Sequence, residues 1–167
     1  AQLTARPTCD MLKLEPTLLD FCNESHAVKD FFVGEPPYRD WAFRHRQVRP
    51  LLMNPQVVSM GHEWYRHPSL SSYTFGQGVE RVYDGLDELF RSLGYVHDRY
   101  SGRYRVEQES DKRVALFAHQ GFGMVFLSCL LDIPYPLFAT HFDICHSSMT
   151  VIDLHNEDGW AVPRVLT

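Results

Sequence analysis

The sequence lacks any apolar run of the roughly 18 residues that a membrane-spanning helix needs, and it does not open with the charged and then apolar pattern of a signal peptide. Its four cysteines include no CxxC pair, so we expect reduced cysteines that pack in the fold. It has no basic cluster with interleaved aromatic residues, and its net charge of -5 argues against a nucleic-acid partner. We therefore expect a cytoplasmic protein with no membrane or nucleic-acid partner.

Motifs of several enzyme classes are also missing. There is no glycine-rich P-loop, which would bind the phosphates of a nucleoside triphosphate, and no GxSxG sequence, which would hold the nucleophile of a serine esterase. The sequence therefore does not predict either activity. His62 and His67 are five residues apart, as are His141 and His146, whereas histidines that share a zinc ion on one helical face are four apart. We therefore expect no metal and no cofactor.

The most informative stretch is a short apolar run, a polar break and a longer apolar run. Residues 114–118 predict a strand that is buried on both faces, and residues 122–131 predict a helix. The turn between them holds His119, Gln120 and Gly121. In parallel α/β sheets such a turn lies at the carboxyl end of a strand, where ligands bind, and the N–H groups of the helix point into the same space. Gly121 and Gly123 are expected to let a ligand approach the backbone closely. His119 is therefore placed to bind an anion, although a histidine that only bonds a backbone carbonyl would suit the position too.

The rest of the chain is predicted to form one domain with a substantial core, since 44% of its 167 residues are hydrophobic. The expected elements are helices at 4–13, 39–48, 75–93 and 134–139, strands at 17–21, 149–154 and 160–165, and a hairpin at 95–111. Residues 25–74 are rich in proline and aromatic side chains, and we expect an insertion that covers a pocket as a lid. A purely structural excursion is the alternative.

Glu24 follows the strand expected at 17–21, as His119 follows the strand expected at 114–118. If the two strands are neighbours, a carboxyl group and an imidazole meet over one helix N-terminus and form an anion site with a proton donor. Asp20 is a competing carboxylate, although it lies within the strand. The cationic sequence Arg44-His45-Arg46, in the insertion, could place an arginine on an anionic substrate, although it also suits the solvated face of a short helix.

Several weak motifs in order resemble the C-terminal half of the histidine phosphatase, or phosphoglycerate mutase-like, superfamily. They are Ala118-His119-Gln120-Gly121, the helix behind it, Ile133-Pro134, Leu137-Phe138 and the strand from Ser148 to Ile152. The residues from Ala1 to Ala5 are similar to the end of that family's second motif, in which an arginine precedes Ala-x-x-Thr-Ala. The resemblance implies an α/β fold, a three-layer sandwich with a mostly parallel central sheet flanked by helices, together with a helical or irregular lid.

The resemblance also implies phosphoryl transfer through a phosphohistidine, either as a phosphatase or as a mutase, on a small phosphorylated metabolite. His119 matches the family's second histidine, which holds phosphate oxygens, here with Gln120 and Gly121. Glu24 is similar to the acid that protonates the leaving oxygen. Charge-assisted donors of this kind stabilise the transition state of phosphoryl transfer.

The nucleophilic histidine of the family lies in an Arg-His-Gly motif, which does not occur in these residues. We therefore expect the chain to be incomplete at its N-terminus and inactive alone. A catalytically inactive module that binds phospho-ligands is the main alternative. An interaction protein that uses the Trp and Tyr side chains of residues 31–75 is a weaker one. A homodimer is compatible with the sequence.

Overall fold

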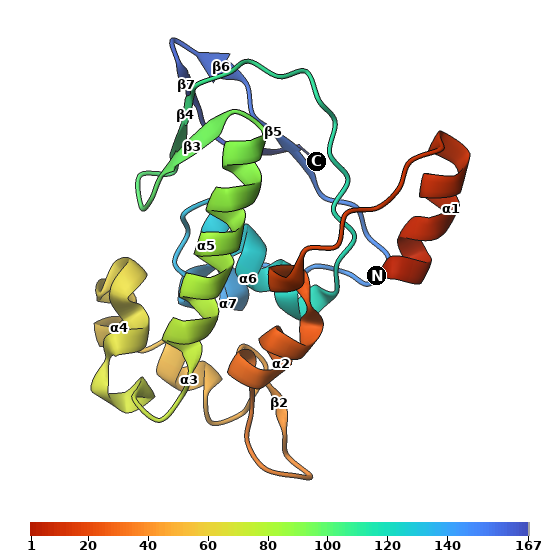
Figure 1. Ribbon diagram of the computed structural model, residues 1–167. Coiled ribbons are helices and arrows are strands. Elements are labelled where there is room, and N and C mark those ends of the chain that lie inside the picture. The colour runs from red at the N-terminus through yellow and green to blue at the C-terminus, as the bar shows by residue number, and fades with distance from the viewer. Residues whose placement is uncertain (167) are drawn as a thin grey trace.

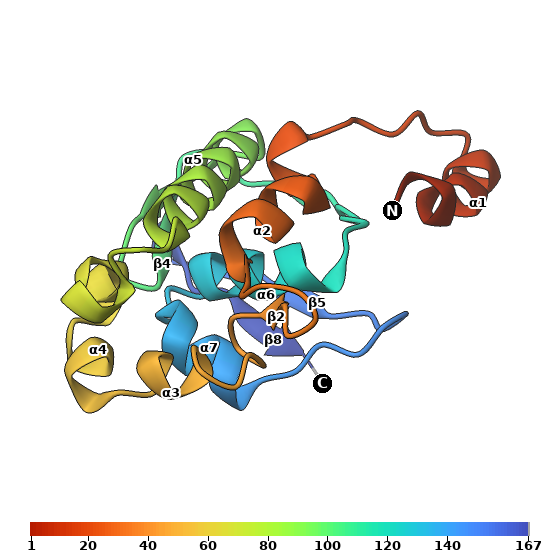
Figure 2. The ribbon, with the colours of Figure 1, turned by 90° about the horizontal axis from the view of Figure 1, so that it is seen from below.

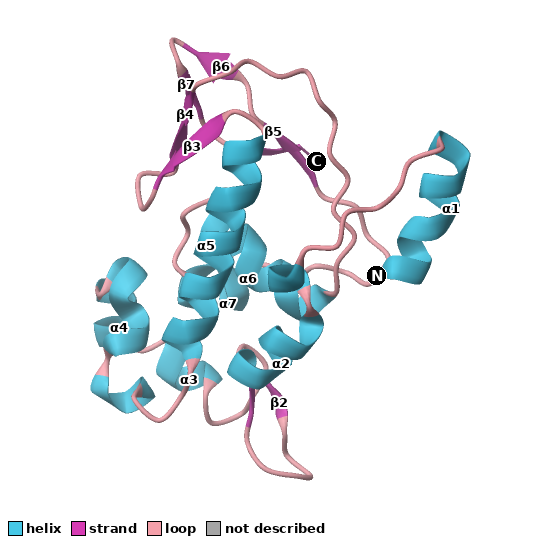
Figure 3. Ribbon diagram, viewed as in Figure 1, coloured by secondary structure: helices cyan, strands magenta, loops and turns pink. Residues whose placement is uncertain are grey.

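The computed structural model describes residues 1–166 and shows a mixed α/β chain (Figures 1 and 3). The α-helices are α1 (Gln2–Leu12), α2 (Glu24–Phe31), α3 (Arg49–Leu52), α4 (Pro55–Ser59), α5 (Phe75–Ser92), α6 (Gln120–Leu130) and α7 (Tyr135–His141). The strands are β1 (Phe32–Val33), β2 (Asp40–Trp41), β3 (Tyr95–Asp98), β4 (Arg103–Val106), β5 (Val151–Asp153), β6 (Asn156–Glu157), β7 (Trp160–Ala161) and β8 (Arg164–Leu166). Short 3-10 helices occupy Asp20–Cys22, Gly61–Arg66 and Pro68–Leu70.

Helix α5 is the long element on which the others pack, and it confirms the helix predicted at 75–93. Val79, Val82 and Leu86 recur at spacings of three and four, and all are buried. α5 contacts α2, α6 and β3 (Figure 2). A side chain at Gly85 would overlap the ring of Phe21, so this glycine lets the segment before α2 lie directly on α5.

The sheets are small and antiparallel, in contrast to the predicted three-layer sandwich with a mostly parallel central sheet. Within residues 1–166 the pairings are β1 with β2, β5 with β8, and the order β3-β4-β7-β6. The hairpin predicted at 95–111 is confirmed, with Tyr95 opposite Val106. The strand predicted at 149–154 is present as β5, but its neighbour β8 runs antiparallel to it. The prediction of a parallel sheet is therefore wrong.

The central strand of that prediction is not formed. Residues 114–118 belong to no strand, and Val114 and Leu116 are 55% and 38% exposed. An unbroken apolar run is typical of a strand with neighbours on both sides, but apolarity alone does not supply those neighbours. The strand predicted at 17–21 is also absent, since the chain there is irregular and ends in the 3-10 turn at Asp20–Cys22.

Residues 25–74 build a large part of the core. Val48, Leu52, Val57 and Trp64 are almost completely buried. The helix predicted at 39–48 is replaced by β2 and a series of turns that lead into α3. The role of this segment as a lid stays a prediction.

Helix α1 projects from the rest of the chain in both ribbon views (Figures 1 and 2). It confirms the helix predicted near the start, but only Ala5 on it is buried. The helix therefore contributes little to the core. Within the described part of the chain, no helix combines the length and the apolar character needed to cross a bilayer.

Candidate functional site

The candidate site lies at the N-terminus of α6, where His119 is the residue that precedes the helix. Its backbone is extended, with φ -93° and ψ 161°, and its side chain makes no capping hydrogen bond. The imidazole is exposed, and its Nε2 lies 3.3 Å from the amino group of Ala1. The helix predicted at 122–131 is confirmed and begins two residues earlier, at Gln120. The imidazole is therefore accessible to solvent, but a ligand that accepts from its Nε2 would have to displace the Ala1 amino group.

Glu24 reaches the same helix end from α2. The Asn23 side chain accepts the Ser25 N–H at 3.0 Å and caps α2, which fixes Glu24 in the first turn. The Oε2 atom of Glu24 accepts the backbone N–H of Phe122 at 3.0 Å. The N-terminus of α6 therefore already holds one carboxylate, in the manner expected of a helix end with unpaired N–H groups.

Glu24 thus reaches the helix end that follows His119 without a parallel sheet, but the two side chains share no hydrogen bond within residues 1–166, and their joint role stays a prediction. α2 packs against α6, and this helix–helix contact places Glu24 at the N-terminus of α6, the end that follows His119. Asp20, the competing carboxylate, instead pairs with His26 at 3.0 Å, on an exposed surface. The geometry therefore favours Glu24 over Asp20 as the acid of this site.

Two further side chains surround the end of α6 and already have partners. The Gln120 side-chain amide donates to Asp143 Oδ1 at 2.8 Å and to the Ile144 carbonyl at 2.6 Å. Arg44 Nη2 lies 3.5 Å from the same Asp143 oxygen. A phosphate that recruits Arg44 or the Gln120 side chain would therefore have to compete with Asp143.

The glycines of this turn differ from expectation. Gly121 was expected to let a ligand approach the backbone, but the Trp41 ring lies where a side chain at Gly121 would be. The backbone N–H groups of Gln120 and Gly121 have no hydrogen-bond acceptor among residues 1–166. A ligand at this end would therefore meet these two N–H groups along the helix axis, not over the face of Gly121.

Replacing Gly121 with alanine should destabilise the protein by about 1–3 kcal/mol, because the added methyl group forces Trp41 or α6 to move. Gly123→Ala is the matched control, since its methyl group would make an ordinary 3.6 Å contact with Ile144 and gain up to about 1 kcal/mol of helix propensity. Urea unfolding of both variants measures the difference. Equal stability of the two would contradict the close packing of Trp41 on α6.

A second polar cluster was missed by sequence reasoning. The side chain of His97 is fully buried. Its Nδ1 lies 3.0 Å from Asp87 Oδ1, and its Nε2 lies 3.0 Å from Asp132 Oδ2. Its ring stacks on Tyr104 with centroids 4.2 Å apart. Arg99 continues the cluster with bonds to Asp87, Glu80 and Asp84. The cluster ties α5 and the β3–β4 hairpin to the end of α6, and a structural role explains it fully.

A sequence signal for this cluster does exist. Glu80, Asp84 and Asp87 are spaced by four and three, which places three carboxylates on one face of α5. His97 and Arg99 alternate along the following strand and its turn, so both side chains point toward the same neighbour. An acidic helix face next to a strand with two basic residues at that spacing indicates such a cluster.

The stability of the protein should fall as the pH rises above 6.5. Burial alone would lower the pKa of His97, but the bonds and charges of Asp132 and Asp87 outweigh it and raise that pKa above 6.5. The stabilisation from a raised histidine pKa is complete below the unfolded value and is lost as the pH rises through the folded value. Urea unfolding between pH 6 and pH 9 measures this loss. The His97→Phe variant keeps a stacked ring and should show a flatter profile, whereas an unchanged slope would contradict a charged His97.

Comparisons with known proteins assign the chain to no family. No family model matches the chain, and no curated protein or solved structure matches it either. Across the described residues, no group of three or more His, Cys, Asp or Glu side chains is placed to hold a metal ion. The α6 N-terminus, with Glu24 on its Phe122 N–H, is therefore the feature from which a function is inferred.

Proposed function

We propose that the chain binds a phosphate monoester at the N-terminus of α6. We propose further that it is part of a phosphohydrolase of the histidine-phosphatase type. The observation that carries the proposal is the Glu24 carboxylate on the Phe122 N–H at 3.0 Å, at the end of a helix that an exposed histidine, His119, precedes. A helix end that holds a carboxylate has the donors and the dipole that a phosphate also uses.

In the proposed complex, phosphate oxygens accept the N–H groups of Gln120 and Gly121, and His119 donates a further charge-assisted hydrogen bond. These donors are fixed by the helix before the substrate arrives, so they can stabilise charge on the transferred phosphoryl group without rearrangement. Arg44 becomes a third positive contact if it leaves Asp143, from which its Nη2 is separated by 3.5 Å.

Glu24 supplies the proton for the leaving oxygen in this proposal. The Glu24 carboxyl group already lies at the helix end that the phosphate would occupy. The protonated carboxyl group can then donate to the oxygen that leaves. Hydrolysis by the family's route also needs a nucleophilic histidine in an Arg-His-Gly sequence, which these 167 residues do not contain.

A second candidate function is a module that binds a phospho-ligand without turning it over. The same donors at α6 serve both functions, so binding alone does not separate them. Calorimetric titration with inorganic phosphate tests the binding site. Hydrolysis of p-nitrophenyl phosphate, by this chain and by the whole product of its gene, separates the functions. Turnover supports the phosphohydrolase, binding without turnover supports the module, and no phosphate binding contradicts both.

For the phosphohydrolase, Glu24→Gln should slow an alkyl phosphate ester by about 100-fold and p-nitrophenyl phosphate by much less, because only a poor leaving group needs the proton. The amide oxygen of glutamine can still accept the Phe122 N–H, so substrate binding should be retained. Steady-state kinetics with both esters, on a form that turns them over, measures the ratio. Equal slowing of the two would point to a structural role for Glu24.

A further inference from the structure

The loop that follows α7 is bound to the first turn of α6 through one side chain. The Gln120 amide donates to Asp143 Oδ1 at 2.8 Å and to the Ile144 carbonyl at 2.6 Å. Residues 142–147 belong to no helix or strand, and the side chain of Asp143 is 67% exposed. Two hydrogen bonds from Gln120 therefore place an exposed carboxylate beside the N-terminus of α6.

Arg44 faces the same carboxylate. Its Nη2 lies 3.5 Å from Asp143 Oδ1, and its guanidinium group lies over the Phe43 ring, 5.2 Å from the ring centroid. An exposed ion pair of this length contributes little to stability, so it can break when a more highly charged anion arrives. Asp143 thus contacts two side chains, Gln120 and Arg44, that could otherwise donate to a phosphate.

The charge of Asp143 acts in the same direction as its contacts. Glu24 already places one carboxylate on the Phe122 N–H, and Asp143 adds a second carboxylate at the first turn of α6. Like charges repel, so each of these carboxylates lowers the affinity of the helix end for an anion. Glu24 has the role of a proton donor in the proposed function, whereas Asp143 has no role in it.

We propose that Asp143 is an autoinhibitory residue of the phosphate site, because its carboxylate occupies Gln120 and Arg44 and has to leave them before both can bind phosphate. The inference rests on the proposed function, since it describes the regulation of the same site. Only molecules in which these contacts are open bind phosphate with full affinity, so the contacts reduce the apparent affinity. The loop after α7 is the element that moves.

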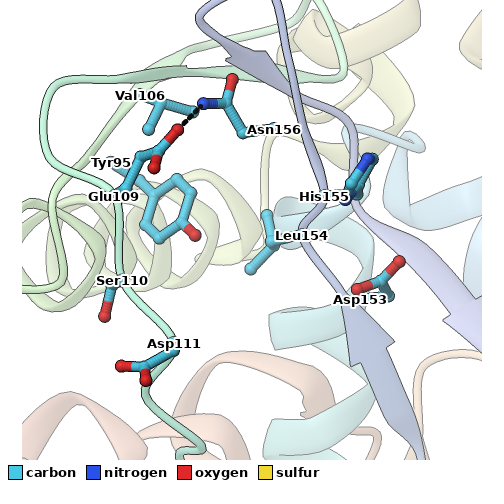
Figure 4. Close-up of a pocket in the computed structure, with 9 residues that line it drawn as sticks. All are labelled: Tyr95, Val106, Glu109, Ser110, Asp111, Asp153, Leu154, His155 and Asn156. Carbon is cyan, nitrogen blue, oxygen red and sulfur yellow. Dashed lines mark hydrogen bonds between the residues drawn. The ribbon is translucent and has the colours of Figure 1, made fainter.

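A cavity elsewhere in the chain is a poor alternative place for phosphate. It measures about 530 Å³ and lies between the segment that follows β4 and the chain from β5 to β6 (Figure 4). Glu109, Asp111 and Asp153 line it, and Asp153 pairs with Arg164 at 2.9 Å. This negative balance repels a phosphate. A change of phosphate affinity after a substitution of Asp143 therefore reports on the α6 site.

Calorimetric titration of this chain with inorganic phosphate at low ionic strength compares the wild type with two variants of Asp143. Asp143→Asn keeps an oxygen that can accept from Gln120 and removes the charge, so it should tighten binding about threefold. Asp143→Ala also releases Arg44 and one hydrogen of the Gln120 amide, so it should tighten binding about tenfold. Added salt should reduce the gain of Asp143→Asn, since that gain comes from charge.

Asp98→Asn is the matched control for the loss of one negative charge. Asp98 is also an exposed carboxylate in a pair with an arginine, since its Oδ2 lies 3.1 Å from Arg103 Nε. The pair belongs to the β3–β4 hairpin, whose Gly102 N–H bonds to Asp132, just beyond the C-terminal end of α6. The substitution therefore acts at the opposite end of α6 and should leave phosphate binding unchanged.

The outcomes separate the autoinhibitory role from the phosphate site itself. Phosphate binding by the wild type that Asp143→Ala leaves unchanged or weakens would overturn the autoinhibitory role, and the phosphate site would stand. No phosphate binding by the wild type or by either variant would overturn both. Equal tightening by Asp98→Asn would also overturn the role, because the gain would then follow from net charge alone. The unfolding midpoints of the variants should match that of the wild type, since both positions are exposed.

Discussion

Replacing Asp132 with alanine should lower the free energy of unfolding by about 3–5 kcal/mol, because it leaves a buried cation without one of its two carboxylates. The side chain of Asp132 is 2% exposed and accepts three hydrogen bonds, from Tyr83 Oη at 3.0 Å, His97 Nε2 at 3.0 Å and the Gly102 N–H at 2.9 Å. Alanine removes both carboxylate oxygens and so all three hydrogen bonds at once. Its backbone also has φ 48°, which alanine adopts less readily than aspartate. Urea unfolding at pH 6.5 measures the loss.

Two control variants separate the causes of this loss. Asp132→Asn keeps the shape and tolerates the positive φ, so it should lose less than alanine and isolate the effect of charge. Asp84→Asn breaks a 2.7 Å contact with Arg99, but its side chain is 74% exposed, so the expected loss is at most about 1 kcal/mol. Losses of the same size for Asp132→Ala and Asp84→Asn would contradict a buried cluster around His97.

The second large effect is expected for His119→Ala at the proposed phosphate site. Loss of a charge-assisted hydrogen bond should weaken phosphate binding by about 10- to 100-fold. In a form of the protein that hydrolyses p-nitrophenyl phosphate, the same change should lower kcat/KM by about 100- to 1,000-fold, because the donor stabilises charge that develops in the transition state. Calorimetry and steady-state kinetics measure the two effects.

His155→Ala is the matched control for this prediction, since it removes another exposed histidine, which lies between β5 and β6. It should leave phosphate binding unchanged. His119 is exposed and packs in no core, so its removal should not change the unfolding midpoint. Unchanged turnover in the His119→Ala variant would remove this residue from the mechanism.

Elements with a strong local pattern could be predicted from the sequence. The apolar stripe of α5, the hairpin of β3 and β4, and the helix that follows His119 all carry their signal within one segment. The run at 114–118 carries an equally strong signal and yet forms no strand. Helices satisfy their hydrogen bonds internally, whereas a strand depends on partners elsewhere in the chain, and those partners are not visible in the run itself.

The sequence predicted that Glu24 lies near the N-terminus of the helix after His119, but it predicted the wrong structural cause. His119 and Glu24 were expected at the ends of neighbouring parallel strands, and the structure carries Glu24 to α6 through a helix–helix contact instead. The expected open approach over Gly121 is filled by Trp41, a residue 80 positions away. Contacts of this range depend on the tertiary fold, and no local pattern encodes them.

The most direct test of the central claim is a titration of the isotope-labelled chain with inorganic phosphate, followed through its backbone amide signals by NMR. The amide signals of Gln120, Gly121 and Phe122 should move most and saturate together, and the His119→Ala variant should need about 10- to 100-fold more phosphate for the same shift. Signals that move elsewhere, or these three unchanged at saturating phosphate, would contradict an anion site at the N-terminus of α6.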